Sequence, residues 1–525
     1  MLKYKYQNFY EIIQNNAKLN PKKIAIFLDD KKMSNLKLKQ DIDTFARFLE
    51  FSGIKKGDRV AMIIGNSIEF VISFFAITKI GAIAVPMNNF LKKGEFEFII
   101  NDCEAKLLIC APSFAKETKN LLDTTTIQKI VWTDKYDDLD ENNYSFAEMD
   151  ATTQNEEEDE SLPTLDELAC VIYTSGTTGR PKGAMLSFRN VLSNSIGAVE
   201  VFDVKESDRF VVFLPMFHSF TLSTSVLLPL YTGASMVVVK SVFPFANVLK
   251  QVLLRRVTVF LGVPTLYNAL LKAKIPWYFM FFHKVRLFIS GGAPLSEASL
   301  NEFNKKFKKS TLIEGYGLSE CSPVVAANTL EKQKPLSIGP ALPGYEVKIV
   351  NEEMVELPIE DIGEIIVKGD NVMQGYLNHS EATDETIING WLKTGDLGKM
   401  DDEGYIYIVD RKKDLIISKG INIYPREIEE WLAKFEGVDS AAVVGIKNKA
   451  SDEEVVAFIQ PKEDVVLNEL EIKKYLKSHL ANFKLPKSIY IVEELPKNAT
   501  GKVLKRVLKE QIAKGEFLKS DKLHN

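Results

Sequence analysis

The sequence of 525 residues contains little cysteine and little histidine, and neither residue type gathers into a metal-binding pattern. A structural zinc site needs clustered Cys and His ligands, and small disulfide-rich proteins carry dense cysteine frameworks. The four cysteines have no CxxC spacing and lie apart from the five histidines; they are Cys103, Cys110, Cys170 and Cys321. The pattern therefore predicts neither a zinc site nor a disulfide framework.

Long uncharged apolar runs and an excess of positive charge are also missing. The longest apolar stretch, Glu69–Pro86, is interrupted by Lys79, whereas a membrane-spanning helix needs about 18 uncharged residues. The N-terminal segment MLKYKYQNFYEIIQ has no apolar core, so we expect no signal peptide. With 66 Lys and Arg against 71 Asp and Glu, the net charge of −5 disfavours nucleic acid as a partner. We expect a cytoplasmic protein.

The sequence does contain an ordinary share of hydrophobic residues, 46%, which is enough for a large core. Short apolar runs typical of buried strands alternate with helical patterns such as Ser67–Ile80 and Asn190–Val199. The runs are Arg59–Ile64, Ala105–Ala111, Lys129–Trp132, Ala169–Thr174 and Arg209–Pro215. The alternation predicts an α/β fold with a large, multi-layer N-terminal domain of mixed, largely parallel sheets and helices. The acidic Asn155–Pro163 is more typical of a solvated surface loop than of a domain boundary.

A change of pattern near Asp410–Lys413 predicts a second, smaller domain. Beyond it, Pro425 begins an amphipathic helical pattern that Gly437 follows, and two strand-like runs and another helix come next. We therefore expect a large domain over residues 1–410 and a small α+β domain over residues 411–525.

A glycine- and hydroxyl-rich segment, YTSGTTGRPKG (Tyr173–Gly183), follows one of the predicted strands. Small residues let backbone N–H groups approach phosphate oxygens, and Lys182 adds a positive charge. The composition fits a phosphate-binding loop and an ordinary surface hairpin about equally well. A Walker A loop is excluded, because it needs Lys and then Ser or Thr directly after its last Gly, whereas Arg180 and Pro181 follow Gly179.

Seven segments in chain order resemble motifs of the adenylate-forming superfamily of acyl-CoA synthetases, luciferases and peptide-synthetase adenylation domains. They are YTSGTTGRPKG, FHSF (Phe217–Phe220), SGGAPLS (Ser290–Ser296), EGYGLSE (Glu314–Glu320), LKTGDLG (Leu392–Gly398), DRKKDLIISKGINIYPREIE (Asp410–Glu429) and LPKNATGKVLKR (Leu495–Arg506). Within the superfamily the chain resembles acyl-CoA synthetases of the long-chain fatty acid–CoA ligase type. The resemblance implies that a carboxylate attacks the α-phosphate of ATP and releases pyrophosphate. Coenzyme A then displaces AMP from the acyl-adenylate.

The resemblance also implies which residues bind ATP. The β- and γ-phosphates would be held by Thr174, Ser175, Gly176, Thr177, Thr178, Gly179 and Lys182. The adenine slot would be formed by Gly292, Ala293 and Pro294 together with Tyr316, and Glu314, Gly315 and Gly317 would also bind ATP. Asp396 would accept the ribose hydroxyls with help from Arg411. Ser319 stands where the family more often has Thr, but it keeps the hydroxyl group.

The catalytic groups are implied in the same way. Glu320 would bind Mg²⁺, a hard cation that takes carboxylate and phosphate oxygens together. Lys502 would neutralise charge between the carboxylate and the α-phosphate, although it also fits the polar face of an amphipathic terminal helix. Lys413 matches the hinge about which the small domain rotates between the two half-reactions. Lys419 and Gly420 match the loop beside the thiol tunnel, where many relatives have Gly-Gly.

We expect the acid in two apolar segments, Phe217–Tyr231 and Phe260–Leu271. The acyl-pocket residues would be Phe217, His218, Gly262, Val263 and Pro264. These segments carry no Asp or Lys to pair with an amino acid, so an alkyl or aryl tail fits better, and a medium- or long-chain fatty acid is our hypothesis. His218 would orient the carboxylate or serve as a buried structural histidine.

Other functions stay open from sequence. An acyl-AMP or aryl-acid ligase that loads a separate carrier protein would share these motifs, and so would a non-catalytic nucleotide sensor, against which Lys502, Glu320 and Asp396 argue. The aromatic run Pro276–Lys284 is typical of a core or a tunnel wall. If exposed, it would let the protein touch the inner face of a membrane transiently. The sequence makes no prediction of the oligomeric state.

Overall fold

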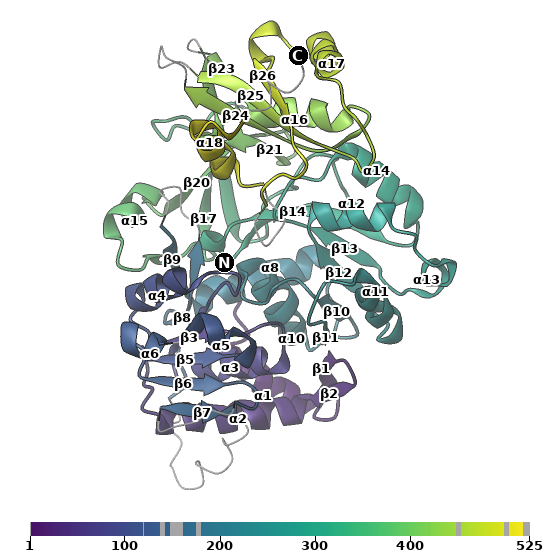
Figure 1. The fold of residues 1–525 in the computed structure, drawn as a ribbon. Coiled ribbons are helices and arrows are strands. Elements are labelled where there is room, and N and C mark those ends of the chain that lie inside the picture. Colours follow the sequence, from purple (N-terminus) through teal and green to yellow (C-terminus); the bar gives the residue numbers. More distant parts are fainter. Residues whose placement is uncertain are drawn as a thin grey trace. The chain divides into compact units, whose positions relative to one another are not determined.

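The computed structural model describes residues 2–118, 120–136, 142–146, 161–174, 180–418, 421–447, 453–497 and 503–517. The chain divides into two compact units, drawn in Figure 1. The large unit comprises Met1–Val347 and Val367–Lys393, and the small unit comprises Lys348–Ile366 and Thr394–Asn525. The predicted α/β class with a smaller C-terminal part is confirmed. Most of the acidic segment Asn155–Pro163 lies outside the described residues.

One sheet of the large unit has, over the described residues, the strand order β15-β14-β13-β12-β10-β11-β1-β2. Its central strands are parallel: β14 (Thr311–Gly317), β13 (Leu287–Ser290), β12 (Val259–Gly262), β10 (Arg209–Val212), β11 (Ser235–Val238) and β1 (Ile24–Leu28). The edge strands β15 (Val324–Ala327) and β2 (Lys31–Ser34) are antiparallel to their neighbours. The predicted strand at Arg209–Pro215 is β10.

The second sheet of this unit has the order β18-β9-β8-β4-β3-β5-β6-β7. Its parallel strands are β8 (Leu168–Thr174), β4 (Ile83–Pro86), β3 (Arg59–Ile63), β5 (Leu107–Cys110), β6 (Lys129–Trp132) and β7 (Asn143–Ser145). The strands β9 (Lys182–Ser187) and β18 (Gly375–Tyr376) complete it in antiparallel pairing. The other predicted strands are β3, β5, β6 and β8.

Successive side chains of a strand point to opposite faces of its sheet, so a sheet with apolar residues on both faces must be covered on both. Helices provide this cover. From β12 and β13, Phe260 and Phe288 enter one core with Tyr267, whereas Leu261 and Ile289 enter another. The longer helices are α1 (Phe9–Leu19), α2 (Asn35–Phe51), α3 (Ile68–Lys79), α4 (Lys93–Asp102), α8 (Phe188–Phe202), α11 (Phe245–Leu254), α12 (Pro264–Lys272) and α14 (Glu297–Lys306). The shorter ones are α5 (Ala115–Thr118), α6 (Leu121–Thr124), α9 (Ser219–Thr221), α10 (Leu228–Thr232), α13 (Trp277–Phe282) and α15 (Ser380–Thr386).

Serine side chains fix where several of these helices begin. Ser34, Ser67, Ser187 and Ser296 each accept a hydrogen bond from the backbone N–H three residues further on, before α2, α3, α8 and α14. Such N-caps satisfy one of the unpaired N–H groups of the first turn. The predicted helices at Ser67–Ile80 and Asn190–Val199 are α3 and α8. No helix among the described residues is long and apolar enough to cross a membrane.

The small unit is built around a three-stranded sheet with the order β24-β25-β26. The strands are β24 (Val438–Lys447), β25 (Glu453–Pro461) and β26 (Ser488–Ile491), and the hairpin β22 (Ile416–Ser418) and β23 (Ile421–Ile423) precedes them. Buried residues of α16 (Pro425–Lys434) and α17 (Glu469–His479) belong to one core, and Leu508 of α18 (Lys505–Ala513) belongs to the other. The helix predicted to begin at Pro425 is α16.

Contacts divide the chain differently from the predicted boundary at residue 410. The strands β16 (Tyr345–Val350), β17 (Gly363–Gly369) and β20 (Trp391–Met400) each contain a dividing point, and β21 (Ile406–Arg411) pairs with β20 inside the small unit. The short β19 (Ile387–Ile388) pairs with the start of β20. The sequence pattern marked where the α+β part begins, and a domain of residues 411–525 that moves as one body stays a prediction.

Candidate active site

Three predicted motifs meet at one edge of the first sheet. Gly262 and Ser290 end β12 and β13 and stand in register with Glu314, which lies in the middle of β14. In open α/β sheets, ligands bind beyond the carboxyl ends of parallel strands. Residues 263–264 and 291–294 follow β12 and β13, and β14 extends beyond them through residues 315–317 toward 319–320, so the topology gathers these segments on one side.

The loop after β13 has the backbone freedom and the exposure that a flat ligand needs. Gly292 has a φ of +80°, a backbone conformation that residues other than glycine seldom adopt. Ala293 and Pro294 are exposed. The Glu314 carboxylate accepts a hydrogen bond of 2.9 Å from the backbone N–H of Leu295, which ties the loop to β14. The predicted ATP-binding residues of the loop after β13 and of β14 are therefore neighbours.

Glycine is also required on β14, where the chain turns toward the segment 319–320. A Cβ on Gly317 would lie 2.1 Å from the carbonyl oxygen of Pro323, so no larger residue fits without moving the backbone. Gly315 is less crowded, with the Ala326 carbonyl oxygen 3.4 Å from a Cβ built there. Tyr316 between them is half-buried and offers an aromatic ring at this edge.

The second sheet contributes the two ends of the predicted phosphate loop. Thr174 at the end of β8 pairs with Lys182 at the start of β9, so the hairpin carries the loop between them. The Lys182 Nζ lies 5.3 Å from the centroid of the Tyr376 ring. The other predicted phosphate ligands, Ser175, Gly176, Thr177, Thr178 and Gly179, lie outside the described residues.

Glu320 is contacted by residues of the second sheet although it follows β14 of the first. Its Oε1 accepts hydrogen bonds from Thr174 Oγ1 at 3.3 Å and from the Tyr376 hydroxyl at 3.0 Å. Beside it, the hydroxyl groups of Ser319 and Ser219 are 2.8 Å apart. The hairpin of one sheet and the carboxyl edge of the other thus face a single carboxylate.

This arrangement suits magnesium better than a metal held by protein alone. Among the residues that the structure describes, no three His, Cys, Asp or Glu side chains gather as a metal site. Mg²⁺ is usually held by one or two carboxylates together with waters and substrate phosphates. The single Glu320 carboxylate, which lies among hydroxyl groups and next to the hairpin of the predicted phosphate loop, matches this mode of Mg²⁺ binding.

Tyr376 is a site residue that the sequence motifs did not indicate. Strand β18 pairs antiparallel with β9 and sets Tyr376 opposite Ala184, close to both Lys182 and Glu320. A local signal precedes it, because Gly375 has a φ of +137° and packs against Thr383. A glycine followed by an aromatic residue is nonetheless too common a pair to identify a site.

His218 is poised as a neutral imidazole. Its Nδ1 accepts a hydrogen bond of 3.3 Å from the backbone N–H of Phe220 at the start of α9. Burial lowers the pKa of His218 below its usual value. An accepting Nδ1 leaves the ring proton on Nε2, which can then donate to a carboxylate.

The predicted acyl residues lie at the same edge. Phe217 is buried against Phe90, with ring centroids 6.3 Å apart. A Cβ on Gly262 would come within 3.0 Å of Leu266 and Tyr267. Val263 caps α12 and Pro264 is its first residue.

The absence of a side chain at Gly291 lets the Phe220 ring pack closely against the backbone there. A Cβ on Gly291 would lie 3.2 Å from the Phe220 ring. Phe220 of the histidine segment thus packs against the start of the loop of residues 291–294. The glycines at 262 and 291 allow aromatic rings to approach this edge closely.

In the small unit, Asp396 and Arg411 are paired across β20 and β21. Arg411 Nε lies 3.0 Å from Asp396 Oδ1, and Asp396 is buried whereas Arg411 is half-exposed. Thr394 Oγ1 accepts a hydrogen bond from the Asp396 backbone N–H, and Gly395 between them has a φ of +71°. The structure therefore brings together the two residues predicted to act on the ribose.

Lys413 follows in the short helical turn Lys412–Asp414. Burial, with the positive charge of Arg411, lowers the pKa of Lys413. Its neighbour Lys412 is anchored to Glu364 at 3.1 Å. Lys419, Gly420 and Lys502 lie outside the described residues.

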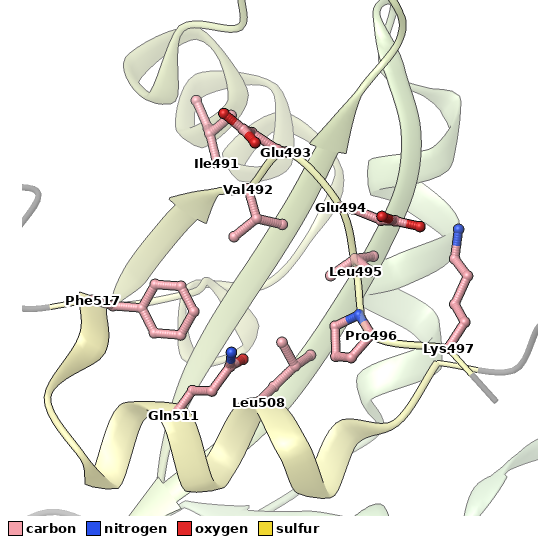
Figure 2. Close-up of a pocket in the computed structure, with 10 residues that line it drawn as sticks. All are labelled: Ile491, Val492, Glu493, Glu494, Leu495, Pro496, Lys497, Leu508, Gln511 and Phe517. Carbon is pink, nitrogen blue, oxygen red and sulfur yellow. The ribbon is translucent and has the colours of Figure 1, made fainter. Parts of the chain in front are cut away.

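The small unit also has a hollow of about 680 Å³ beside α18. In Figure 2, Leu508 and Gln511 line it from the helix, and Phe517 lies beyond the helix end. Residues 491–497 form the opposite wall, and none of the predicted site residues that the structure describes lines the hollow. Lys497 in this wall bridges to Val503 in antiparallel fashion, so the two described ends of the Lys502 segment are held side by side.

Comparison with known proteins agrees with this geometry. The profile of the family described as AMP-binding enzyme matches residues 13–377, and that of the AMP-binding enzyme C-terminal domain matches residues 427–502. The long-chain-fatty-acid–CoA ligase of Bacillus subtilis strain 168 is 35% identical over 542 residues, which covers 97% of this chain and 95% of that protein. The 2-succinylbenzoate–CoA ligase of Bacillus velezensis is 34% identical over 506 residues, with 95% and 97% covered.

Solved structures show the same fold. O-succinylbenzoate coenzyme A synthetase (MenE) from Bacillus subtilis, in complex with ATP and magnesium ion, superposes with a TM-score of 0.83. It is 30% identical, and the match covers 96% of this chain and 99% of that one.

Proposed function

The chain belongs to the AMP-binding enzyme family, and from that premise we propose that it joins a medium- or long-chain fatty acid to coenzyme A. It is an AMP-forming acid–thiol ligase that uses ATP, Mg²⁺ and coenzyme A. In the first half-reaction the carboxylate attacks the α-phosphate and pyrophosphate leaves. In the second, the thiol of coenzyme A takes the acyl group and AMP leaves.

The observation that carries the proposal is the cluster around Glu320. Thr174 of the β8–β9 hairpin and Tyr376 of β18 donate to this carboxylate, Lys182 lies over the Tyr376 ring, and residues 291–294 follow β13 of the other sheet. Phosphoryl transfer needs positioning and charge neutralisation more than a protein nucleophile. A single carboxylate, a lysine and hydroxyl groups meet that need.

In the proposal, the large unit binds the nucleotide and the acid. The phosphates bind to Thr174, Ser175, Gly176, Thr177, Thr178, Gly179 and Lys182, and Ser319 adds a hydroxyl group. Adenine stacks on Tyr316 beside the small residues Gly292, Ala293 and Pro294, and Glu314, Gly315 and Gly317 complete the ATP site. Glu320 holds Mg²⁺, which when bound neutralises charge on the phosphates.

His218 orients the acid. As a neutral imidazole it donates from Nε2 to the carboxylate and leaves the negative charge available for attack. Phe217, Gly262, Val263 and Pro264 surround the start of the tail. A charged imidazolium would instead form an ion pair with the nucleophile and weaken it.

Residues of the small unit complete the proposed chemistry. Asp396, oriented by Arg411, accepts the ribose hydroxyls. Lys502 neutralises the charge that grows between the carboxylate and the α-phosphate. Lys413 serves as the hinge between the half-reactions, and Lys419 and Gly420 line the path of the thiol.

The apolar character of residues 217–231 and 260–271 supports a fatty acid, as does the similarity to long-chain-fatty-acid–CoA ligases. An aryl acid is the second candidate, because a 2-succinylbenzoate–CoA ligase is about as similar. The proposal includes transient contact with a membrane surface, where such acids partition. A carrier protein in place of coenzyme A, and a sensor without catalysis, are the remaining alternatives.

A panel of acids from acetate to oleate, with benzoate and 2-succinylbenzoate, tests the proposal. Each acid is mixed with ATP and Mg²⁺, with and without coenzyme A, and pyrophosphate and acyl-CoA are measured. We expect the highest kcat/KM among medium- and long-chain acids. A preference for the aromatic acids would assign the second candidate, and acyl transfer to a phosphopantetheine carrier but not to coenzyme A would replace the acceptor.

A further inference from the structure

Helix α13 presents most of its aromatic side chains to solvent. The exposed fractions are 77% for Trp277, 65% for Phe281 and 59% for Phe282, and Tyr278 is exposed as well. Phe279 faces inward and stacks on the buried His283, with ring centroids 5.4 Å apart. The interpretation of this aromatic run as part of a core or a tunnel wall is therefore wrong for its exposed side chains. Soluble proteins rarely expose such a patch without a partner.

A neighbouring helix also has exposed apolar side chains at its ends. α13 lies beside α11 at the periphery of the large unit, as Figure 1 shows. The side chains of Phe243, which precedes α11, and of Leu254, at its end, are also exposed. Large apolar side chains are thus concentrated on these two adjacent helices and their ends.

Positive charge accompanies these apolar groups. Residues 209–296, which include both helices, contain nine Lys and Arg and neither Asp nor Glu, although the whole chain has a net charge of −5. Lys274 and Lys284 flank α13 and are exposed. Lys309 reaches over the ring of Phe281, with Nζ 5.3 Å from the ring centroid.

We propose that α13 and its lysines form a docking surface for a bilayer that contains anionic lipid. Trp and Tyr rings favour the headgroup region, phenylalanine side chains enter the acyl boundary, and lysines are attracted to anionic headgroups. A bilayer fits better than a protein partner because aromatic groups and one sign of charge are combined on a short peripheral helix. This proposal depends on the proposed function in one respect only: the surface would bring the enzyme to acids that partition into membranes.

Vesicle co-sedimentation without ATP, acid or coenzyme A tests the surface by itself. We expect the wild type to bind vesicles of phosphatidylcholine and phosphatidylglycerol, and to bind pure phosphatidylcholine several-fold less. High salt should weaken the binding, because surface charges are then screened. The fluorescence of Trp277, the most exposed of the described tryptophans, should shift to shorter wavelength on binding.

Two pairs of variants separate the surface from general effects. The double variant Trp277→Ser and Phe281→Ser should bind at least about five-fold less, whereas Phe51→Ser, half-exposed on α2, should bind like the wild type. Lys284→Glu with Lys309→Glu should likewise lose binding. Lys18→Glu with Lys116→Glu changes the net charge equally at exposed sites and should not.

Three results would overturn the proposal. The wild type could fail to bind anionic vesicles at low salt, or the control variants could lose as much binding as the α13 variants. Light scattering could show a dimer that Trp277→Ser with Phe281→Ser abolishes, which would assign the surface to a second copy. Equal thermal midpoints for all variants would show that a loss of vesicle binding does not come from misfolding. A failure to bind vesicles would not affect the proposal that the protein is a ligase, because the vesicle assay contains no substrate.

Discussion

At the scale of single residues, the site depends on contacts between distant parts of the chain. Thr174 and Glu320 are 146 positions apart and Tyr376 is 56 beyond Glu320, yet both hydroxyl groups donate to one carboxylate oxygen. The motifs indicated Thr174 and Glu320 separately because each lies in a segment of unusual composition. Tyr376 could not be found this way, since its role comes from the pairing of β18 with β9 and not from its neighbours in sequence.

Tyr376 should position Glu320 for the metal and the nucleotide. Tyr376→Phe removes the hydrogen bond to the carboxylate but keeps the ring below Lys182, so we expect the KM for Mg·ATP to rise about ten-fold with a smaller change in kcat. Tyr376→Leu removes both contacts and should weaken nucleotide binding further. Equilibrium binding of Mg·ATP, measured by calorimetry without acid, checks both expectations.

Tyr4 provides the matched control, because its hydroxyl donates to the Asp370 carboxylate at 2.7 Å, outside the site. Tyr4→Phe should leave Mg·ATP binding unchanged. If Tyr376→Phe binds Mg·ATP as tightly as the wild type, the hydroxyl has no positioning role.

Two histidines with lowered pKa values should make stability depend on pH. Burial lowers the pKa of His218, and burial with nearby Lys309 and Lys284 lowers the pKa of His283. Between these lowered values and about 6.5, the unfolded chain binds more protons than the native one. The stabilisation from each neutral ring is therefore complete above pH of about 6.5 and is lost as the pH falls through the native pKa.

Urea unfolding at pH 7.5 and 5.5 measures this effect. The wild type should be less stable at the lower pH, by at most about 1.4 kcal/mol per histidine and pH unit. His218→Asn and His283→Asn should each reduce the difference, and the double variant should reduce it most. An identical pH dependence in all four proteins would contradict the assignment.

At the scale of elements, the predicted strands and helices agree with the structure because apolar periodicity and helix-start residues indicated them. Apolar runs became the inner strands of two parallel sheets, and Ser and Pro marked helix starts at α3 and α16. The strands β16, β17 and β20 were not predicted. β16 and β20 are partly buried and mix polar with apolar residues, and in β17, which is mostly buried, the apolar run is only three residues long. The six residues of α13 are too few for periodicity to tell an exposed face from a buried one.

The element that follows Lys502 is held by an ion pair. Lys505 at the start of α18 lies 2.8 Å from Glu429 of α16, and both side chains are largely buried. Burial alone would lower the pKa of Lys505, but Glu429 and Asp410 outweigh it and raise the pKa. Glu429→Ala would leave this lysine without its main partner and should destabilise the small unit by about 2 kcal/mol.

A second ion pair on the same helix serves as the control. Arg506 and Glu510 are 3.6 Å apart and well exposed, so Glu510→Ala should cost less than about 0.5 kcal/mol. Urea unfolding of both variants gives the comparison. Equal costs would mean that the Lys505 pair contributes no more than a surface pair.

Lys413 is a test of the proposed hinge. Lys413→Pro restricts φ and removes a backbone N–H, so it should slow overall turnover more than it slows either half-reaction measured separately. Lys413→Ala removes only the side chain and should turn over faster than the proline variant. Full turnover in Lys413→Pro would show that the hinge lies elsewhere.

At the scale of the whole molecule, family and architecture were predictable because seven motifs occur in one order over a long stretch of chain. The two-unit organisation was also predicted, whereas the contacts draw the dividing line at other residues. Tail specificity could not be predicted, since apolar pocket walls accept alkyl and aryl groups alike. Relatives with both kinds of acid are about equally similar to this chain.

The most direct measurement follows the two half-reactions of Lys502→Ala separately, with Arg506→Ala as the nearby control. Acid-dependent exchange of labelled pyrophosphate into ATP reports adenylate formation, and acyl-CoA formed from supplied acyl-adenylate reports thiolysis. We expect Lys502→Ala to lose exchange by at least about 100-fold and to keep most thiolysis, while the wild type and Arg506→Ala perform both. If the wild type shows no exchange with any acid of the panel, the chain does not form an adenylate and the account is contradicted.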